Sequence, residues 1–116
     1  MVYSAMRYKV VLLEPAQRFI AGLHEKLKAK ALRAIDLLED FGPYLAMPHA
    51  RKLRSHDIWE LRVKQGSDIC RLFYFHHAGV AYIVTSGYVK KSDKTNPLEI
   101  ERAERLRQQV LSAEDR

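Results

Sequence analysis

The chain has 116 residues, of which 47% are hydrophobic and 29% charged, a composition that excludes intrinsic disorder and indicates one folded domain over residues 1–116. Lysine and arginine outnumber the acidic residues by 20 to 14, which gives a net charge of +6. Such a basic surface favours a polyanion such as nucleic acid, although a solvated face kept for solubility explains the charge equally well.

The first forty residues predict one strand and two helices. The apolar run 8–13 is typical of a strand, and Pro15 follows it at a point where a helix can begin. From Pro15 onward, and again over about residues 24–41, apolar residues recur at steps of three and four, so each segment is expected to bury one helical face. Gly42 and Pro43 then end the second helix.

A change of period marks the passage from the helices to a sheet. Residues 42–50 contain two prolines and no steady period, so we expect a loop there. Apolar and polar residues then alternate over residues 58–64, as in a strand with one buried side. The polar face of this strand carries three charged residues: Glu60, Arg62 and Lys64.

The next strand, residues 69–76, is apolar on both faces except at Arg71, as expected of a central strand. A turn at 77–79 leads to a third strand at 80–85, so the three strands are expected to form a meander. Cys70 lies inside the central strand and is the only cysteine of the chain. We therefore expect a buried small side chain rather than a reactive thiol, no internal disulfide, and a reducing, cytoplasmic setting.

Residues 86–96 are polar and basic and predict an exposed loop. Pro97 can occupy the first turn of a last helix with Asn96 as its cap, and apolar residues between Ile100 and Val110 give this helix one buried stripe. The order strand, two helices, three strands and helix indicates an α+β fold, in which the helices gather on one side of the sheet.

Motifs for metals, nucleotide cofactors and membranes are absent from the sequence. His76 and His77 diverge on a strand, and no CxxC or HExxH spacing completes a metal site. There is no GxSxG sequence and no glycine-rich phosphate loop, so we expect neither a metal nor a cofactor. No apolar run approaches the roughly 18 residues that a membrane span needs, and the N-terminus lacks the apolar core of a signal peptide.

Arg62 and Arg71 are the most unusual residues, because a purely structural strand has no need of an arginine. Arg62 can pair with Glu60 or lie exposed, whereas a charge at Arg71 costs stability unless it is used or paired. Both residues suit a phosphate, since a guanidinium donates two hydrogen bonds to an oxyanion and stays charged. Other cations and aromatic residues are expected on the same sheet: Lys52, Arg54, His56, Tyr74, Tyr88, Lys90, Lys91 and Lys94.

This group of residues suits the cleavage of RNA. An RNA strand carries its own nucleophile, the 2′-hydroxyl, so an enzyme can cut it without a metal by positioning it, neutralising phosphate charge and assisting proton transfer. A lysine or tyrosine among cations can relay the protons. Plainer interpretations also remain, with the lysines as solvated charge and the tyrosines as packing residues. The expected RNA contacts are Lys52, Arg54, His56, Tyr74 and Lys94.

The chain resembles the RelE/ParE superfamily of bacterial toxin–antitoxin toxins, and in particular its HigB-like, phage-derived branch. The likeness spans roughly residues 6–110 and includes a last helix with Glu99, Ala103 and Arg107. It is carried by Lys52-Leu53, Trp59-Glu-Leu-Arg62, Arg71-Leu-Phe-Tyr74 and Gly87-Tyr-Val-Lys-Lys-Ser-Asp-Lys-Thr95. The resemblance implies a microbial RNase-like (RelE-like) fold: a small antiparallel-rich sheet with two N-terminal helices packed on one side and a C-terminal helix.

The resemblance also implies roles for single residues. Arg71 matches the family's strand arginine, which is placed against the scissile phosphate, and Arg62 matches a basic position on the preceding strand. Lys90 and Lys91 fall where the family has basic residues after its last strand. Tyr88 lies near the tyrosine that some members use but does not clearly match it. The general base therefore stays open among Lys90, Lys91, Tyr88 and His56.

At the level of function, the resemblance implies a ribonuclease that cuts messenger RNA, usually on the ribosome. A helix-turn-helix (HigA-like) antitoxin is expected to neutralise it, for example in a toxin–antitoxin heterotetramer. We therefore expect a metal-independent mRNA endonuclease that leaves a 2′,3′-cyclic phosphate. Two alternatives remain: a ParE-like toxin of the same fold that poisons DNA gyrase without being an enzyme, and a nucleic-acid-binding module without catalysis.

Overall fold

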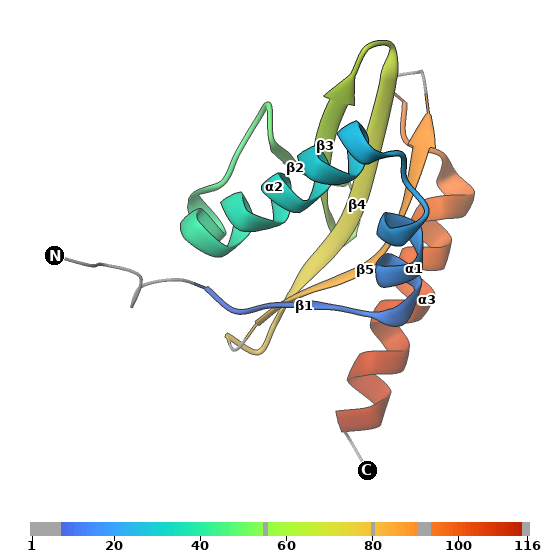
Figure 1. Ribbon diagram of the computed structural model, residues 1–116. Helices are drawn as coiled ribbons and strands as arrows, with labels where there is room; N and C mark the ends of the chain where they lie inside the picture. The colour runs from blue at the N-terminus through green and yellow to red at the C-terminus, as the bar shows by residue number, and fades with distance from the viewer. Residues whose placement is uncertain (1–7, 55, 80, 91–93, 115–116) are drawn as a thin grey trace, which may run out of the picture.

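A computed structural model describes residues 8–54, 56–79, 81–90 and 94–114 of the chain. A five-stranded sheet is covered by helices, as Figure 1 shows, which confirms the expected α+β fold. In chain order the elements are β1 (Val10–Leu12), α1 (Glu14–Ala21), α2 (Glu25–Phe41), the 3-10 turn η2 (Gly42–Tyr44), β2 (Ala50–Lys52), β3 (Trp59–Gln65), β4 (Asp68–His77), β5 (Ala81–Lys90) and α3 (Pro97–Glu114).

The sheet has the strand order β1-β5-β4-β3-β2. β3, β4 and β5 form the expected antiparallel meander, and β1 pairs with β5 in parallel. β4 is the central strand, as its apolar sequence predicted, and its residues 70–75 are all buried. Because β4 has neighbours on both edges and side chains buried on both faces, both faces of the sheet need a cover.

The expected loop over residues 42–50 ends in a strand that the sequence did not reveal. Residues 50–52 form β2, which pairs antiparallel with the start of β3 and places Arg51 opposite Glu60. A strand of three residues is too short to show a period of two, so only its pairing identifies it.

The last strand is longer than the sequence indicated, because β5 continues past Thr85 to Lys90. Residues 86–90, expected in an exposed loop, therefore belong to the sheet. Gly87 permits this packing: a methyl group on it would lie 2.7 Å from the Phe19 ring of α1 and 2.8 Å from the Arg71 carbonyl oxygen. This glycine, which lies in the segment expected as a loop, instead lets α1 lie directly against the strand.

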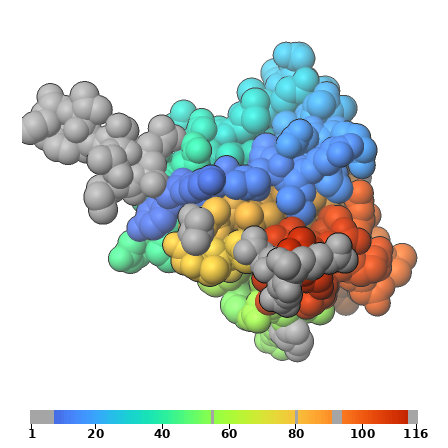
Figure 2. Space-filling model, turned by 90° about the horizontal axis from the view of Figure 1, so that it is seen from below, coloured from blue at the N-terminus to red at the C-terminus, as the bar shows by residue number. Residues whose placement is uncertain are grey.

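The helices lie on both faces of the sheet, and the expectation that all of them gather on one side is wrong for α3. Helices α1 and α2 pack on one face, over side chains such as Leu61 and Leu72. Helix α3 covers the other face, where Ala103 packs near Phe73 and Val110 near Phe75. Figure 2 shows this from below, with α1 and α2 in blue to cyan on one side of β4, in yellow, and α3 in red on the other.

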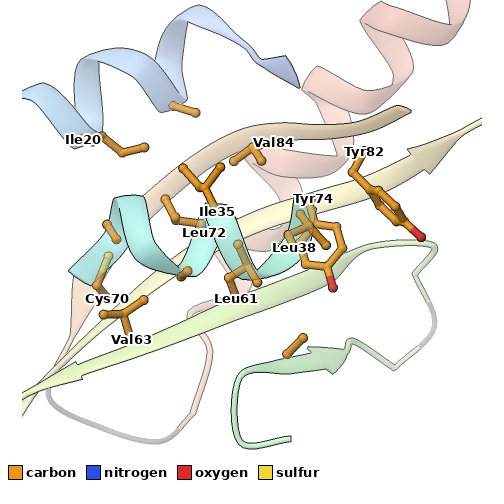
Figure 3. Close-up of a cluster of buried hydrophobic side chains, with 14 of the residues drawn as sticks. Ile20, Ile35, Leu38, Leu61, Val63, Cys70, Leu72, Tyr74, Tyr82 and Val84 are labelled. Atoms are coloured by element: carbon orange, nitrogen blue, oxygen red, sulfur yellow. The ribbon is translucent and has the colours of Figure 1, made fainter. Parts of the chain in front are cut away.

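The larger core lies between the sheet and the two N-terminal helices. Its side chains come from every strand of the meander, as Figure 3 shows. Among its fully buried members are Leu38, Leu61, Cys70, Leu72 and Val84. Burying such side chains contributes about 1.5–3 kcal/mol each, so this layer fixes the position of the sheet beneath α2.

The start of α3 confirms the expected cap. The Asn96 side-chain oxygen accepts a hydrogen bond from the Leu98 backbone N–H at 2.9 Å, and Pro97 occupies the first helical position. None of the helices in the described part of the chain is long and apolar enough to cross a membrane.

Cys70 is buried in the larger core, as its strand position predicted. Burial raises the pKa of its thiol to about 12, so the folded protein holds it as the unreactive neutral thiol. We expect iodoacetamide at pH 8 to alkylate it at least roughly 100-fold more slowly than in the urea-unfolded chain. Because the thiol pKa is higher in the folded state than in the unfolded state, keeping the thiol neutral stabilises the fold. This stabilisation is complete below the unfolded pKa and declines as the pH rises above about 8.5. Equal alkylation rates in the two states would contradict this assignment.

Candidate functional site

A row of candidate functional side chains crosses three strands of the sheet on the face that α3 covers. Arg62 of β3 lies directly opposite Arg71 of β4, and Arg71 lies directly opposite Tyr88 of β5. Residues that oppose each other across strands share a face, so these three side chains lie side by side. Lys90, two residues beyond Tyr88, joins them on the same face. Strand pairing thus gathers four of the residues that the sequence singled out.

A buried carboxylate, that of Glu60, lies next to two arginines of this row. Neither Glu60 nor Arg71 has any exposed surface. Oxygen Oε1 of Glu60 accepts hydrogen bonds from Arg71 at 3.0 Å and from Arg51 at 2.6 Å, and the Nε atom of Arg62 lies 3.6 Å from the same oxygen. A buried charge is tolerated only when it is paired and hydrogen-bonded, so the three arginines explain how a glutamate occupies this strand.

Thr95 connects this network to the segment that precedes α3. Its hydroxyl donates to the Oε2 atom of Glu60 at 2.9 Å and accepts from Arg51 and Arg71, each at 3.2 Å. One donor and two lone pairs satisfy a hydroxyl completely. We call the residues Arg51, Glu60, Arg62, Arg71 and Thr95 the Glu60 network.

A second contact holds the same segment in place. The Tyr88 hydroxyl oxygen accepts a hydrogen bond of 2.6 Å from the Asn96 backbone N–H, and the Tyr88 ring stacks on Phe73 with centroids 5.9 Å apart. The end of the connection from β5 to α3 is therefore fixed against the sheet by two neighbouring residues, Thr95 and Asn96. Lys94, which is exposed, precedes them directly.

Accessibility separates the arginines of the Glu60 network. The Arg71 side chain is fully buried and bound to Glu60, so as it stands it cannot touch a phosphate in the way that the resemblance implied. Arg62 is only 9% exposed, whereas Arg51 is 36% exposed. Of the three guanidinium groups around this carboxylate, that of Arg51 is the most accessible to solvent.

A second set of predicted residues lies around the turn between β2 and β3. Lys52 and Arg54 are exposed, and the ammonium group of Lys52 donates to the His56 carbonyl oxygen at 3.0 Å. The Nδ1 atom of His56 lies 3.7 Å from a carboxylate oxygen of Glu104 in α3. His56 thus lies next to α3, and within the described part of the chain none of the three residues forms a hydrogen bond or an ion pair with the Glu60 network. Lys91 lies outside the described residues.

Glu104 is held as an anion by its neighbours. Burial alone would raise the pKa of its carboxyl, but hydrogen bonds from Gln108 and Arg107, with the Arg107 charge, outweigh burial and lower the pKa below its ordinary value. The carboxylate therefore stays ionised beside His56, and it can orient the imidazole ring.

Tyr74 does not belong to this site, which corrects its predicted role as an RNA contact. It is 2% exposed and lies on the opposite face of the sheet, under α2. Its ring stacks with Trp59 and meets Tyr82 edge-on. Burial, and then the neighbouring Tyr82, raise the pKa of its hydroxyl above the usual range. The side chain is a core residue because alternation along β4 turns it away from Arg71.

Sequence reasoning missed Arg51, Thr95 and Glu104 and considered Glu60 only as a partner of Arg62. The sequence offers one indication for Arg51. Arg51 and Leu53 are two positions apart, as residues on one face of a short strand are. No comparable signal marks Thr95 or Glu104, because their roles depend on contacts 35 and 48 residues away in the chain, with Glu60 and His56. Among the described residues, no group of three or more His, Cys, Asp or Glu could hold a metal ion.

Comparisons with known proteins agree with this architecture. Residues 18–108 match the family model described as "Phage derived protein Gp49-like (DUF891)", whereas no curated protein sequence matches the chain. A mutant of the E. coli toxin RelE in the free state is similar in structure, with a TM-score of 0.56 and 20% identity over 76% of this chain and 86% of that chain. RelE in an archaeal RelE–RelB complex from Pyrococcus horikoshii OT3 has a TM-score of 0.55 and 18% identity over 78% of this chain and 100% of that chain. These likenesses confirm the RelE-like fold.

Replacing Glu60 tests whether the network stabilises the fold. In Glu60→Gln the three arginines lose their shared counter-charge, so we expect the free energy of unfolding to fall by about 3–5 kcal/mol, as for other broken buried pairs. Urea denaturation measures it. The matched control is Glu14→Gln, which removes an exposed pair with Arg18 at the same 2.6 Å spacing as Arg51 and Glu60 and should cost at most about 0.5 kcal/mol. If both variants lost a similar free energy of unfolding, the Glu60 network would stabilise the fold no more than an exposed ion pair does.

Proposed function

Because the chain belongs to the Gp49-like family of phage-derived proteins and has the RelE-like fold, we propose that it is the toxin of a toxin–antitoxin pair and acts as an endoribonuclease on messenger RNA. The observation that carries the proposal is the Glu60 network, in which three arginines share one carboxylate beside Tyr88 and Lys90. A cluster of guanidinium groups of this kind suits the phosphodiester of a nucleic acid.

The proposed reaction uses the nucleophile of the RNA itself. The 2′-oxygen attacks the adjacent phosphorus, the bond from phosphorus to the 5′-oxygen breaks, and the products are a 2′,3′-cyclic phosphate and a 5′-hydroxyl. One group removes the proton of the 2′-hydroxyl and another protonates the leaving 5′-oxygen. No step requires a metal or a cofactor.

The accessible cations are the proposed phosphate contacts. Arg51 and Lys90 flank the buried part of the network, and Lys94 is exposed beside it. Arg71 and Arg62 contribute without touching the phosphate. They add positive charge and hold Glu60, which in turn orients Arg51 by the 2.6 Å contact. Lys52 and Arg54 extend the basic surface along which an RNA strand would run.

We assign proton transfer to residues that the sequence singled out. The Tyr88 oxygen accepts from the Asn96 N–H, which leaves its own O–H to donate, so Tyr88 suits the role of general acid at the 5′-oxygen. Lys90, Lys91 and His56 are the candidates for the general base. His56 has the added support of the Glu104 carboxylate, which orients its ring.

The proposed partners follow from the toxin class. The RelE of Pyrococcus horikoshii was solved in complex with RelB, and by analogy we assign this chain a helix-turn-helix (HigA-like) antitoxin, in a complex such as a heterotetramer. Its substrate is messenger RNA, cut on the ribosome, so its site of action is the cytoplasm. Expression of the chain alone should arrest growth, and co-expression of the antitoxin should relieve that arrest.

Mapping of RNA ends on translating ribosomes tests the enzyme. We expect Arg51→Ala and Lys90→Ala each to lower the cleavage rate by roughly 10- to 100-fold, because each removes a cation that stabilises the negative charge of the transition state. Arg18→Ala, which removes an exposed arginine of α1 far from the network in the chain, should cleave like the wild type. Thermal melts of all variants separate lost catalysis from lost folding.

The alternatives predict different outcomes. Intact message at every codon, together with growth arrest that Arg51→Ala and Lys90→Ala do not relieve, would reject the nuclease in favour of a ParE-like poison of DNA gyrase. Binding to RNA that weakens steeply with salt, without any cleavage products, would instead identify a nucleic-acid-binding module.

A further inference from the structure

A groove runs between α2 and the edge of the sheet, and Arg62 is the member of the Glu60 network that lines it. It consists of three adjoining hollows of about 450, 380 and 330 Å³, and His49 lines all three. We call it the α2–β3 groove and define it by six of its lining residues: Lys30, Arg33, Leu37, Met47, His49 and Lys64.

One end of the groove is apolar and exposed. Phe41, Tyr44 and Met47 are 51%, 79% and 56% exposed and line the same hollow, next to Leu37. Single exposed apolar side chains are ordinary, but several large ones around one hollow mark an interaction surface. Phenylalanine, tyrosine and methionine are also types enriched where proteins meet.

The other end of the groove is basic. Lys30 and Arg33 of α2, together with Arg62 and Lys64 of β3, line a single hollow. Within the described part of the chain, no aspartate or glutamate lines any of the three hollows. An occupant must therefore supply negative charge at this end and apolar side chains at the other.

One wall of the groove is the outer edge of β3, beyond its pairing with β2. β2 pairs only with Trp59–Leu61, and the Arg62 N–H donates to the His49 carbonyl oxygen at 2.9 Å where β2 begins. By the alternation of an antiparallel ladder, the backbone groups of Lys64 also point away from β4, and its carbonyl oxygen accepts from the Lys30 ammonium group at 3.2 Å. The edge of a strand can pair with the main chain of another polypeptide segment. A small anion has no main chain, so this feature favours a protein as the occupant.

We propose that the α2–β3 groove is the docking site for an acidic segment of the partner protein that also carries apolar side chains. Its carboxylates contact Lys30, Arg33 and Lys64, and its apolar side chains cover Tyr44 and Met47. This inference rests on the proposed function for the existence of the antitoxin, and it adds which surface and which chemistry the antitoxin uses. An RNA strand could use the same cations, but an apolar end made of three large exposed side chains favours a protein.

The test is a titration of this chain with the purified helix-turn-helix protein encoded beside it, by isothermal calorimetry. We expect the double variant Tyr44→Ser/Met47→Ser and the single variant Lys64→Glu each to weaken binding at least about tenfold. The matched controls are Leu98→Ser, at an apolar side chain of α3 that is 71% exposed, and Lys26→Glu, at an exposed lysine of α2 that lines none of the three hollows. Both controls should bind within about twofold of the wild type.

Measuring mRNA cleavage by the same variants keeps this inference separate from the proposed function. Groove variants that bind the partner like the wild type overturn the inference and leave the proposed function intact. Groove variants that bind the partner normally but lose RNA binding would identify an RNA surface and also overturn it. If the wild-type chain does not bind the helix-turn-helix protein, the proposed partner is wrong and the inference falls with it, whereas cleavage by the wild type would still support the enzyme.

Discussion

The burial of the Glu60 carboxylate is the constraint on which the rest of the site depends. A carboxylate without exposed surface must be matched by cations and donors, since its desolvation costs several kcal/mol. Those groups come from separate segments: Arg51 from β2, Arg71 from β4 and Thr95 from the approach to α3. One side chain thus explains why β2 lies at the edge of β3, why an apolar central strand carries an arginine, and where the last helix begins.

The same interaction changes what each arginine can do. A guanidinium that must bind an anion gains affinity when its orientation is set beforehand, because less side-chain entropy is lost on binding. Arg51 has this property, since Glu60 and Thr95 hold one of its nitrogen atoms while a third of its side chain stays exposed. Arg71 is the opposite case: it has no exposed surface, so under the proposed function its charge would act on an RNA phosphate through the field and through Glu60. The buried arginine positions the site, and the exposed one is available for contact.

Much of the fold could be predicted from the sequence, because periodicity reports burial directly. The three- and four-residue steps predicted α1 and α2, and the alternation over residues 58–64 predicted β3 and placed Glu60 and Arg62 on one face. The failures share a physical cause. An apolar stripe shows that α3 buries one face but not which side of the sheet it covers. Similarly, the polar and basic residues 86–96 indicate a loop, and only the close approach of Phe19 explains why Gly87 lies in a strand. Likewise the unusual Arg71 was visible, but its partners Glu60 and Thr95 are matters of distance that a pattern of residue types does not contain.

Arg62 belongs both to the Glu60 network and to the lining of the α2–β3 groove, which gives the two regions a physical connection. Its Nε atom lies 3.6 Å from Glu60, and its residue forms part of the wall shared with Lys30 and Lys64. A carboxylate held in the groove, as proposed above, would lower the positive potential around Arg62, because opposite charges partly cancel. The same potential favours an anion beside the exposed Arg51. Occupation of the groove would therefore weaken anion binding at the network, and such a coupling would act equally in both directions.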